Sequence, residues 1–277
     1  MKKYYILLLA CIWMMCMLGC GTRNTSASGG SEGAASQNGG QEVPEGEEPS
    51  SFLAKVISAD EQMLLVEPLY GERELRSADR IEVGIQNILS EEERSSLNEG
   101  DIVQIIYDGY LLETYPAQTQ KVYDVTLKEL SEIFAICYSS WYIAEQKNIY
   151  DTVAGYIQKD LITEGIATVD YTPDDETLVA VWNKVSELDL LSIDRMMIST
   201  VLADSDEVFE MEPCMQYEII IQINGTEYTI KGDETAWYYR GTDEQADSFS
   251  AFVSFMNQLM KNTAEYQSLP EAVGGYD

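Results

Sequence analysis

The choice of side chains that could carry out chemistry is narrow, because the 277 residues contain no histidine. Ser-His-Asp and Cys-His nucleophilic systems need the imidazole as a base, and many zinc sites use it as a ligand. Cys137 and Cys214 lie in the body of the chain and could form a disulfide in an exported protein. Cys137 ends the apolar run 133–137, which favours a small core residue instead. We therefore assign no catalytic residues, no metal site and no cofactor.

Aromatic side chains are the best candidates for a binding surface. Tyr110 and Tyr115 lie in one expected loop, and Trp237, Tyr239 and Arg240 lie in another. Rings of this kind stack on sugars and peptides, and an arginine adds hydrogen-bond donors and a cation. Packing is the alternative for both stretches, because Trp237 and Tyr239 could point inward from a short edge strand. In both stretches the sequence favours packing over binding.

Two acidic clusters raise the question of metal binding. The run 174–176 follows Thr172 and Pro173, which predict an N-cap and the first position of a helix with acids in its first turn. The run 204–207 lacks the glycine and the distal glutamate of a calcium loop. Neither cluster predicts a metal site.

The formal net charge is −31, from 48 acidic and 17 basic residues. Nucleic acids are bound through clusters of lysine and arginine, so this composition argues against a nucleic-acid partner. A charge of this sign and size serves solubility, and it also suits a cationic ligand.

The first twenty residues have the pattern of an export signal. Lys2 and Lys3 precede an apolar run from Tyr4 to Gly19. A retained N-terminal membrane helix is the alternative, but sixteen residues are slightly short for a membrane span.

Two cysteines in this leader are candidates for the processing site. Cleavage before Cys11 would leave only about six apolar residues ahead of it, fewer than export signals use. The run Met17-Leu18-Gly19-Cys20 follows the whole apolar region and precedes a polar stretch. It resembles the lipobox of bacterial lipoproteins, in which the signal peptide is removed and the cysteine is diacylated. The resemblance implies a signal peptide over 1–19 and a lipid anchor at Cys20.

A diacylated Cys20 would hold the protein on the extracytoplasmic face of the cell membrane, since two acyl chains suffice for stable anchoring. Residues 20–50 then contain this anchor and a stretch rich in Gly, Ser and Glu that buries too little apolar surface to fold. Such a tether spans roughly 30 Å root-mean-square.

Residues 51–126 predict a small β-domain. Strand patterns separated by turn signals occur at 52–57, 63–66, 80–85, 102–107 and 121–125, and Ser90 with Glu93 predicts a short capped helix between the third and the fourth. Five strands with a helix in this position are the element order of an OB-type barrel.

The same region resembles a family of small OB-like domains, of uncharacterised function, in lipoproteins of Gram-positive bacteria. The runs Gly100-Asp101-Ile102-Val103, Tyr107-Asp108-Gly109 and Thr114-Tyr115-Pro116-Ala117-Gln118 carry the resemblance. OB folds bind through strand faces and loops that correspond here to 60–61 and 108–119. Tyr110 and Tyr115 fall in the second of these loops.

Residues 127–277 predict an α+β domain with a β-hairpin packed on helices. Helical spacing predicts helices over 127–146 and 149–162, followed by a strand at 166–171. Asn224-Gly225 between two alternating runs predicts a hairpin over 217–231. Thr242, as an N-cap, predicts a closing helix with Phe249, Phe252, Val253, Met256, Leu259 and Met260 on its core face.

These patterns favour a membrane-anchored, non-catalytic binding or accessory protein of the cell envelope, with an envelope peptide, glycan or protein as partner. An envelope glycan hydrolase with paired carboxylates is the first alternative, since that chemistry needs no histidine. A calcium-dependent adhesion module is the second.

Overall fold

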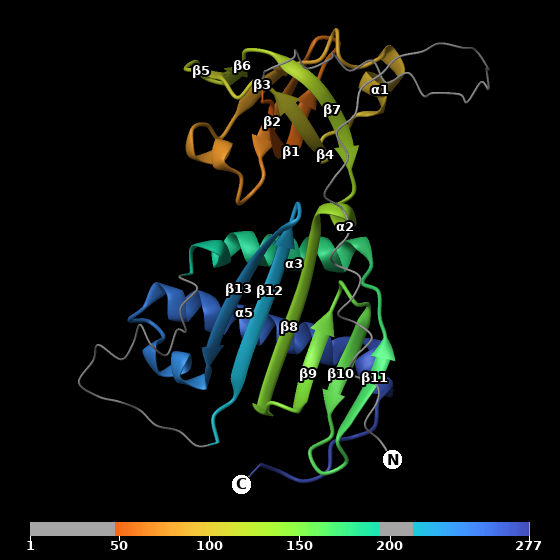
Figure 1. Cartoon of the computed structure of the whole chain (residues 1–277), viewed down its shortest axis with the longest axis vertical. Helices are drawn as coiled ribbons and strands as arrows, with labels where there is room; N and C mark the ends of the chain where they lie inside the picture. The colour runs from red at the N-terminus through yellow and green to blue at the C-terminus, as the bar shows by residue number, and fades with distance from the viewer. Residues whose placement is uncertain (1–47, 194–212, 277) are drawn as a thin grey trace, which may run out of the picture. The chain divides into compact units, whose positions relative to one another are not determined.

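The computed structural model describes residues 48–193 and 213–276, and strands dominate in both ranges (Figure 1). Seven strands form a sheet in the order β5-β6-β3-β2-β1-β4-β7, and six form another in the order β11-β10-β9-β8-β12-β13. These two ranges therefore form a mixed α and β structure with two sheets and few helices.

The seven-stranded sheet is formed by residues 50–128. Its strands are β1 (Ser50–Ala59), β2 (Met63–Pro68), β3 (Ile81–Gly84), β4 (Ile102–Tyr107), β5 (Leu111–Leu112), β6 (Ala117–Thr119) and β7 (Val122–Lys128), accompanied by the 3-10 helix η1 (Arg73–Arg76) and by α1 (Glu91–Ser96). Strands are confirmed at all five predicted places. The two short strands β5 and β6 are additional, and they lie in the stretch that was expected to be a loop.

Alternating hydrophobicity explains this sheet. Along β4, every second side chain is buried, and the inward side chains of neighbouring strands form one apolar cluster. Its main members are Phe52, Val56, Leu64, Val66, Ile81, Val83, Val103 and Ile105.

The predicted cap of α1 is confirmed as a capping box. The backbone N–H of Glu93 donates to Ser90 Oγ at 3.3 Å, and the backbone N–H of Ser90 donates to Glu93 Oε2 at 2.7 Å. These hydrogen bonds favour the charged carboxylate, so the pKa of Glu93 lies below its ordinary value.

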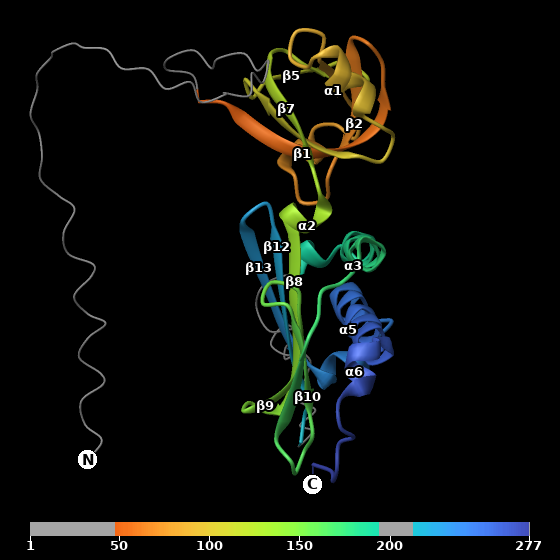
Figure 2. The same ribbon diagram turned by 90° about the vertical axis from the view of Figure 1, so that its right-hand side faces the viewer.

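The six-stranded sheet follows, with helices on one of its faces. Its strands are β8 (Phe134–Ile143), β9 (Gln146–Asp151), β10 (Tyr156–Asp160), β11 (Ile166–Asp170), β12 (Gln216–Ile223) and β13 (Thr226–Asp233), and the helical segments are α2 (Leu130–Ile133), α3 (Asp175–Glu187), η2 (Leu190–Ser192), η4 (Glu234–Tyr239), α5 (Glu244–Asn262) and α6 (Ala264–Ser268). Figure 2 shows this sheet edge-on with α3, α5 and α6 on the same side.

The predicted hairpin is confirmed as β12 and β13. All eight residues of each strand pair, from Gln216 with Asp233 to Ile223 with Thr226. Asn224 and Gly225 have φ angles of 46° and 77°. Positive φ at both central residues is the requirement of a type I′ turn, which is why this dipeptide sets the register.

The helices predicted over 127–146 and 149–162 are wrong, because β8, β9 and β10 occupy most of these ranges. Along β8, Phe134, Ile136 and Tyr138 face the helices and are buried, while Ala135 and Cys137 alternate with them and are half-buried. Apolar side chains on both faces of a strand hide its two-residue period. The spacing then resembles that of a helix.

Two helices begin later than predicted. The N-cap of α3 is Asp174 and not Thr172, because the Asp174 carboxylate accepts a hydrogen bond from the N–H of Thr177 at 2.8 Å. The N-cap of α5 is Asp243 and not Thr242, and its carboxylate accepts from the N–H of Ala246 at 2.8 Å. In both cases an aspartate close to the predicted cap takes the role, since it is also a strong capping residue.

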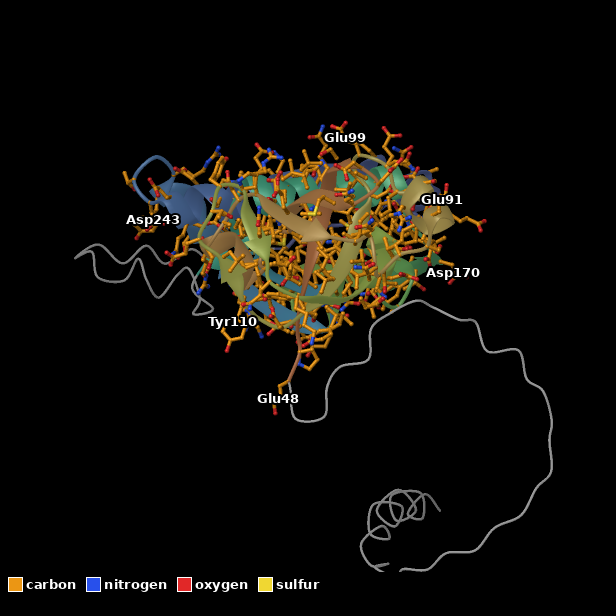
Figure 3. All side chains as sticks on the ribbon, turned by 90° about the horizontal axis from the view of Figure 1, so that it is seen from above. Glu48, Glu91, Glu99, Tyr110, Asp170 and Asp243 are labelled. Atoms are coloured by element: carbon orange, nitrogen blue, oxygen red, sulfur yellow. The ribbon has the colours of Figure 1, made fainter. Side chains whose placement is uncertain are left out.

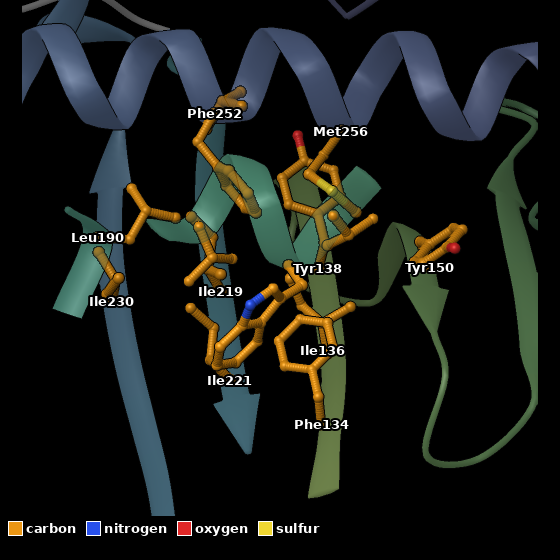
Figure 4. Close-up of a cluster of buried hydrophobic side chains, with 14 of the residues drawn as sticks. Phe134, Ile136, Tyr138, Tyr150, Leu190, Ile219, Ile221, Ile230, Phe252 and Met256 are labelled. Atoms are coloured by element: carbon orange, nitrogen blue, oxygen red, sulfur yellow. The ribbon is translucent and has the colours of Figure 1, made fainter. Parts of the chain in front are cut away.

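The core of the six-stranded sheet lies between its strands and α3 and α5 (Figure 4). Phe252 and Met256 of α5 point toward the inward side chains of β12 and β8, and Phe134 meets Trp182 edge to face with 5.2 Å between ring centroids. The predicted face of α5 is confirmed: Phe249, Phe252, Val253, Met256 and Met260 are buried, and Leu259 is partly buried.

Candidate functional site

Residues 108–121 connect β4 to β7 and include the short strands β5 and β6; this segment is called the β4–β7 loop. It exposes several large apolar side chains. Tyr110 is 67% exposed and Tyr115 is 79% exposed, and Leu112 between them is also exposed. Single exposed apolar residues are normal, but three on one short loop point to an interaction surface. This loop contains two of the residues that the sequence indicates as a binding surface.

Local hydrogen bonds hold the loop in place. Asp108 N donates to Lys121 O at 3.1 Å, and Gln120 N donates to Tyr110 O at 3.3 Å, so the two sides of the loop are tied together. Asp108 Oδ1 accepts from the N–H of Tyr110 at 3.2 Å. Gly109 has a φ of 84°, and a Cβ there would lie 3.0 Å from Ser50 Oγ. The loop therefore presents its tyrosines from a defined backbone.

An open pocket of about 640 Å³ lies beside Tyr110 and is also lined by Glu48, Asp108, Gln120 and Lys121. Figure 3 shows Glu48 and Tyr110 on the same side of the molecule. The lining combines one aromatic face with two carboxylates, an amide and an ammonium group. Lys121 Nζ also lies 4.7 Å from the ring centroid of Tyr123. Such a lining offers stacking together with hydrogen-bond donors and acceptors.

The second predicted aromatic stretch packs inward. Trp237 is half-buried, with ring centroids 5.5 Å from Tyr217 and 6.4 Å from Phe249. Tyr239 is half-buried against the same core, while Arg240 is exposed. The stretch forms the 3-10 helix η4, not an edge strand.

The structure therefore places the five predicted aromatic and arginine candidates on two different elements. Tyr110 and Tyr115 share the β4–β7 loop, whereas Trp237, Tyr239 and Arg240 lie on or next to η4. Glu48, Gln120 and Lys121 were not singled out from the sequence. Lys121 could have been noticed as a cation directly after the tyrosine loop.

The predicted lipid anchor lies outside the described residues. Cys20, the leader and the tether up to residue 47 belong to that part, as does the acidic run 204–207. Within 48–193 and 213–276, no helix is long and apolar enough to cross a membrane.

Two glutamates at η1, Glu72 at its N-cap and Glu74 within it, make internal hydrogen bonds that the sequence did not predict. Glu74 is buried, and its Oε1 accepts from Tyr107 Oη and from Arg73 Nε, each at 2.8 Å. Glu72 accepts from the N–H of Leu53 at 3.1 Å. Burial, and repulsion from Glu74, raise the pKa of Glu72 above its ordinary value. The sequence carries no signal for this burial, because glutamates are usually exposed.

Other titratable groups have structural roles. Cys137 and Cys214 are both free thiols, and burial raises the pKa of Cys137 to about 12. A thiol with that pKa is a poor nucleophile. Asp60 closes the β1–β2 turn by accepting from the N–H groups of Gln62 and Met63 at 2.8 Å. In the described ranges, no group of three or more Cys, Asp or Glu side chains is arranged to hold a metal ion.

Comparison with models of known protein families found no match, and comparison with curated proteins found no similar sequence.

Proposed function

We propose that this protein is a lipoprotein held by diacylated Cys20 on the extracytoplasmic face of the cell membrane, where it works as a non-catalytic binding or accessory module. The lipobox pattern at 17–20 and the polar stretch after it support the anchor. The ligand in this proposal is an envelope peptide, glycan or protein that lies within reach of the tether. The strongly acidic charge makes nucleic acid a poor partner.

The finer fold in this proposal is OB-like, and the strand pairing supports it. β6 pairs in parallel with β3, and β7 pairs antiparallel with β4. In the sheet order β7 is therefore at one end, and β6 is next to the last strand, β5, at the other end. Only Gln120 and Lys121 separate β6 from β7. Taken as one bent strand, the pair would connect the two ends of the sheet, which is the closure of a five-stranded OB barrel.

The exposure of Tyr110 and Tyr115 on the β4–β7 loop carries the binding proposal. In an OB-type fold this loop follows the fourth strand and is one of the two loops that bind ligands. Tyr110 forms one wall of the adjacent pocket, where Gln120 and Lys121 can donate hydrogen bonds and Asp108 can accept them. A sugar ring or a peptide plane could stack on a tyrosine while its polar groups meet these side chains.

The binding proposal is tested with purified cell-wall material made of glycan and peptide. Detergent-solubilised full-length protein is sedimented with this material, as wild type and as the Tyr110→Ala/Tyr115→Ala variant. Each ring contributes about 0.5–1.5 kcal/mol beyond burial, so we expect the double variant to bind roughly tenfold more weakly.

The matched control is Tyr238→Ala, since Tyr238 is a 53% exposed tyrosine on η4. We expect this variant to bind as wild type does. Equal binding by the loop variant and wild type would contradict the assignment of the β4–β7 loop.

The anchor is tested separately by labelling cells with an alkyne fatty acid. We expect label on the wild-type protein and on Cys11→Ala, and none on Cys20→Ala. Label that depends on Cys11, or that survives the loss of Cys20, would overturn the anchor assignment.

A further inference from the structure

The chain after α6 returns to the six-stranded sheet and pairs with the residues that follow β10. Val273 N donates to Leu161 O at 3.2 Å, and Thr163 N donates to Val273 O at 3.3 Å. Thr163 Oγ1 donates to the same carbonyl at 2.8 Å. Ile162 and Val273 thus form a parallel β-bridge. Figures 1 and 2 both show this last segment beside the turn between β10 and β11.

Three residues after the bridge, the half-buried Tyr276 lies against three side chains from β8, β9 and β10, which together are called the tyrosine pocket. Its hydroxyl donates to the carboxylate of Asp160, and the side-chain amide of Gln146 lies 3.3 Å from the same hydroxyl. Its ring centroid lies 5.0 Å from that of Tyr142. The pocket therefore contacts both the ring and the hydroxyl, which distinguishes tyrosine from phenylalanine.

The receiving side of this contact is fixed by bonds that do not involve residues 271–276. Asp160 is only 7% exposed, its Oδ1 accepts from the N–H of Ile162 at 2.7 Å, and its own N–H donates to Asn148 Oδ1 at 3.1 Å. Ile162 has a φ of 65°, a costly conformation for a β-branched residue. Such a conformation persists only where the surroundings enforce it. The Asp160 carboxylate contributes to this through its bond from the N–H of Ile162, a bond to which residues 271–276 contribute no atom.

The segment itself is held weakly. Residues 271–275 are all exposed, and Glu271, the partner of Lys159 at 3.6 Å, is 93% exposed. An ion pair in that position contributes little. Two backbone hydrogen bonds, one bond from the Thr163 hydroxyl and the contacts of a half-buried tyrosine are few for a segment that is otherwise exposed, so it belongs to the parts of a protein that open locally.

We propose that the end of β10 is a binding site for an extended peptide that carries a tyrosine, and that residues 271–276 occupy it in cis. The backbone groups of Leu161 and Thr163 would pair with the peptide, and the pocket of Tyr142, Gln146 and Asp160 would receive its tyrosine. This is recognition by strand addition, in which main-chain bonds supply affinity and a side-chain pocket supplies specificity. The proposal does not depend on the β4–β7 loop.

A fluorescent peptide of residues 269–276 tests this site on the full-length protein. Tyr276→Ala removes the side chain that fills the pocket, so we expect this variant to bind the peptide at least tenfold more tightly than wild type, in which the segment competes. A peptide ending in phenylalanine should bind the variant at least threefold more weakly. Adding Asp160→Asn, which keeps an acceptor for the N–H of Ile162, should abolish the preference for tyrosine.

Gly274→Ala gives a second way to release the segment. Gly274 has a φ of 108°, and a Cβ there would lie 2.9 Å from Thr163 Cγ2. We expect this variant also to bind the peptide more tightly than wild type. Failure of both variants to bind the peptide, or equal binding by wild type and the variants, would overturn the proposal.

Discussion

The two aromatic stretches of this protein have similar composition and opposite surroundings. The β4–β7 loop turns Tyr110 and Tyr115 into solvent, whereas η4 packs Trp237 against Tyr217 and Phe249. Both stretches follow a strand and both contain turn-forming residues. Residue type alone therefore does not decide whether an aromatic side chain lies in the core or on the exposed surface.

The difference arises from what lies next to each stretch. η4 directly follows β13 and leads into α5, whose Phe249 reaches Trp237, so the aromatic residues of η4 meet an existing core. The β4–β7 loop instead contains only the short strands β5 and β6, and no partner covers its tyrosines in the described part of the chain. The two stretches therefore differ in burial because of the long-range packing around them.

The largest effect is expected for Trp237→Ala. Removing this half-buried ring leaves a gap against Tyr217 and Phe249, and we expect a loss of about 2–3 kcal/mol of unfolding free energy. Urea denaturation followed by circular dichroism measures it. A loss similar to that of an exposed tyrosine would mean that η4 is not part of the core.

Gly232→Ala tests the same core by overfilling it. A Cβ at this position would lie 2.5 Å from Phe249 Cζ, so the ring must move. We expect a loss of about 1–3 kcal/mol in the same unfolding assay. Gly100→Ala is the control, because a Cβ at Gly100 would have no atom within 4 Å. It measures only the loss of unfolding free energy from placing alanine at a positive φ. If Gly232→Ala unfolds at the wild-type urea concentration, the packing described around Phe249 is wrong.

Glu72→Gln extends the comparison to a partly buried polar group. Because the pKa of Glu72 is raised, the folded state binds this proton more tightly than the unfolded state does. The wild type should therefore gain stability relative to Glu72→Gln as the pH falls from neutral toward 4.5, the ordinary pKa of the group. The gain is expected to stay below about 1 kcal/mol, since the group is partly screened. A loss over this pH range would contradict the assigned direction.

The smallest effect is expected for the loop tyrosines. Tyr110→Ala and Tyr115→Ala each remove an exposed ring, so the free energy of unfolding should stay within about 0.5 kcal/mol of wild type. Thermal melting measures it. A loss as large as that of Trp237→Ala would show that the loop is a packing element and would remove the contrast between the two stretches.

Local signals predicted the elements that depend on local chemistry. Asn224-Gly225 identified the hairpin because its turn needs positive φ, and Ser90 with Glu93 identified α1 because a capping box lies within four residues. β8 was missed because its burial on both faces depends on strands distant in sequence. Inward packing of Trp237 could be read from the sequence, but its place on the 3-10 helix η4 could not. The burial of Glu74 depends on tertiary packing, which no short pattern reports.

The central claim is that the β4–β7 loop, and not η4, contacts the envelope ligand. Site-specific photocrosslinking in intact cells tests it most directly, with the photoreactive residue placed at Tyr115 or, as a matched exposed position, at Tyr238. We predict crosslinked envelope material from position 115 and none above background from position 238. Adducts from position 238 alone, or from neither position, would contradict the claim.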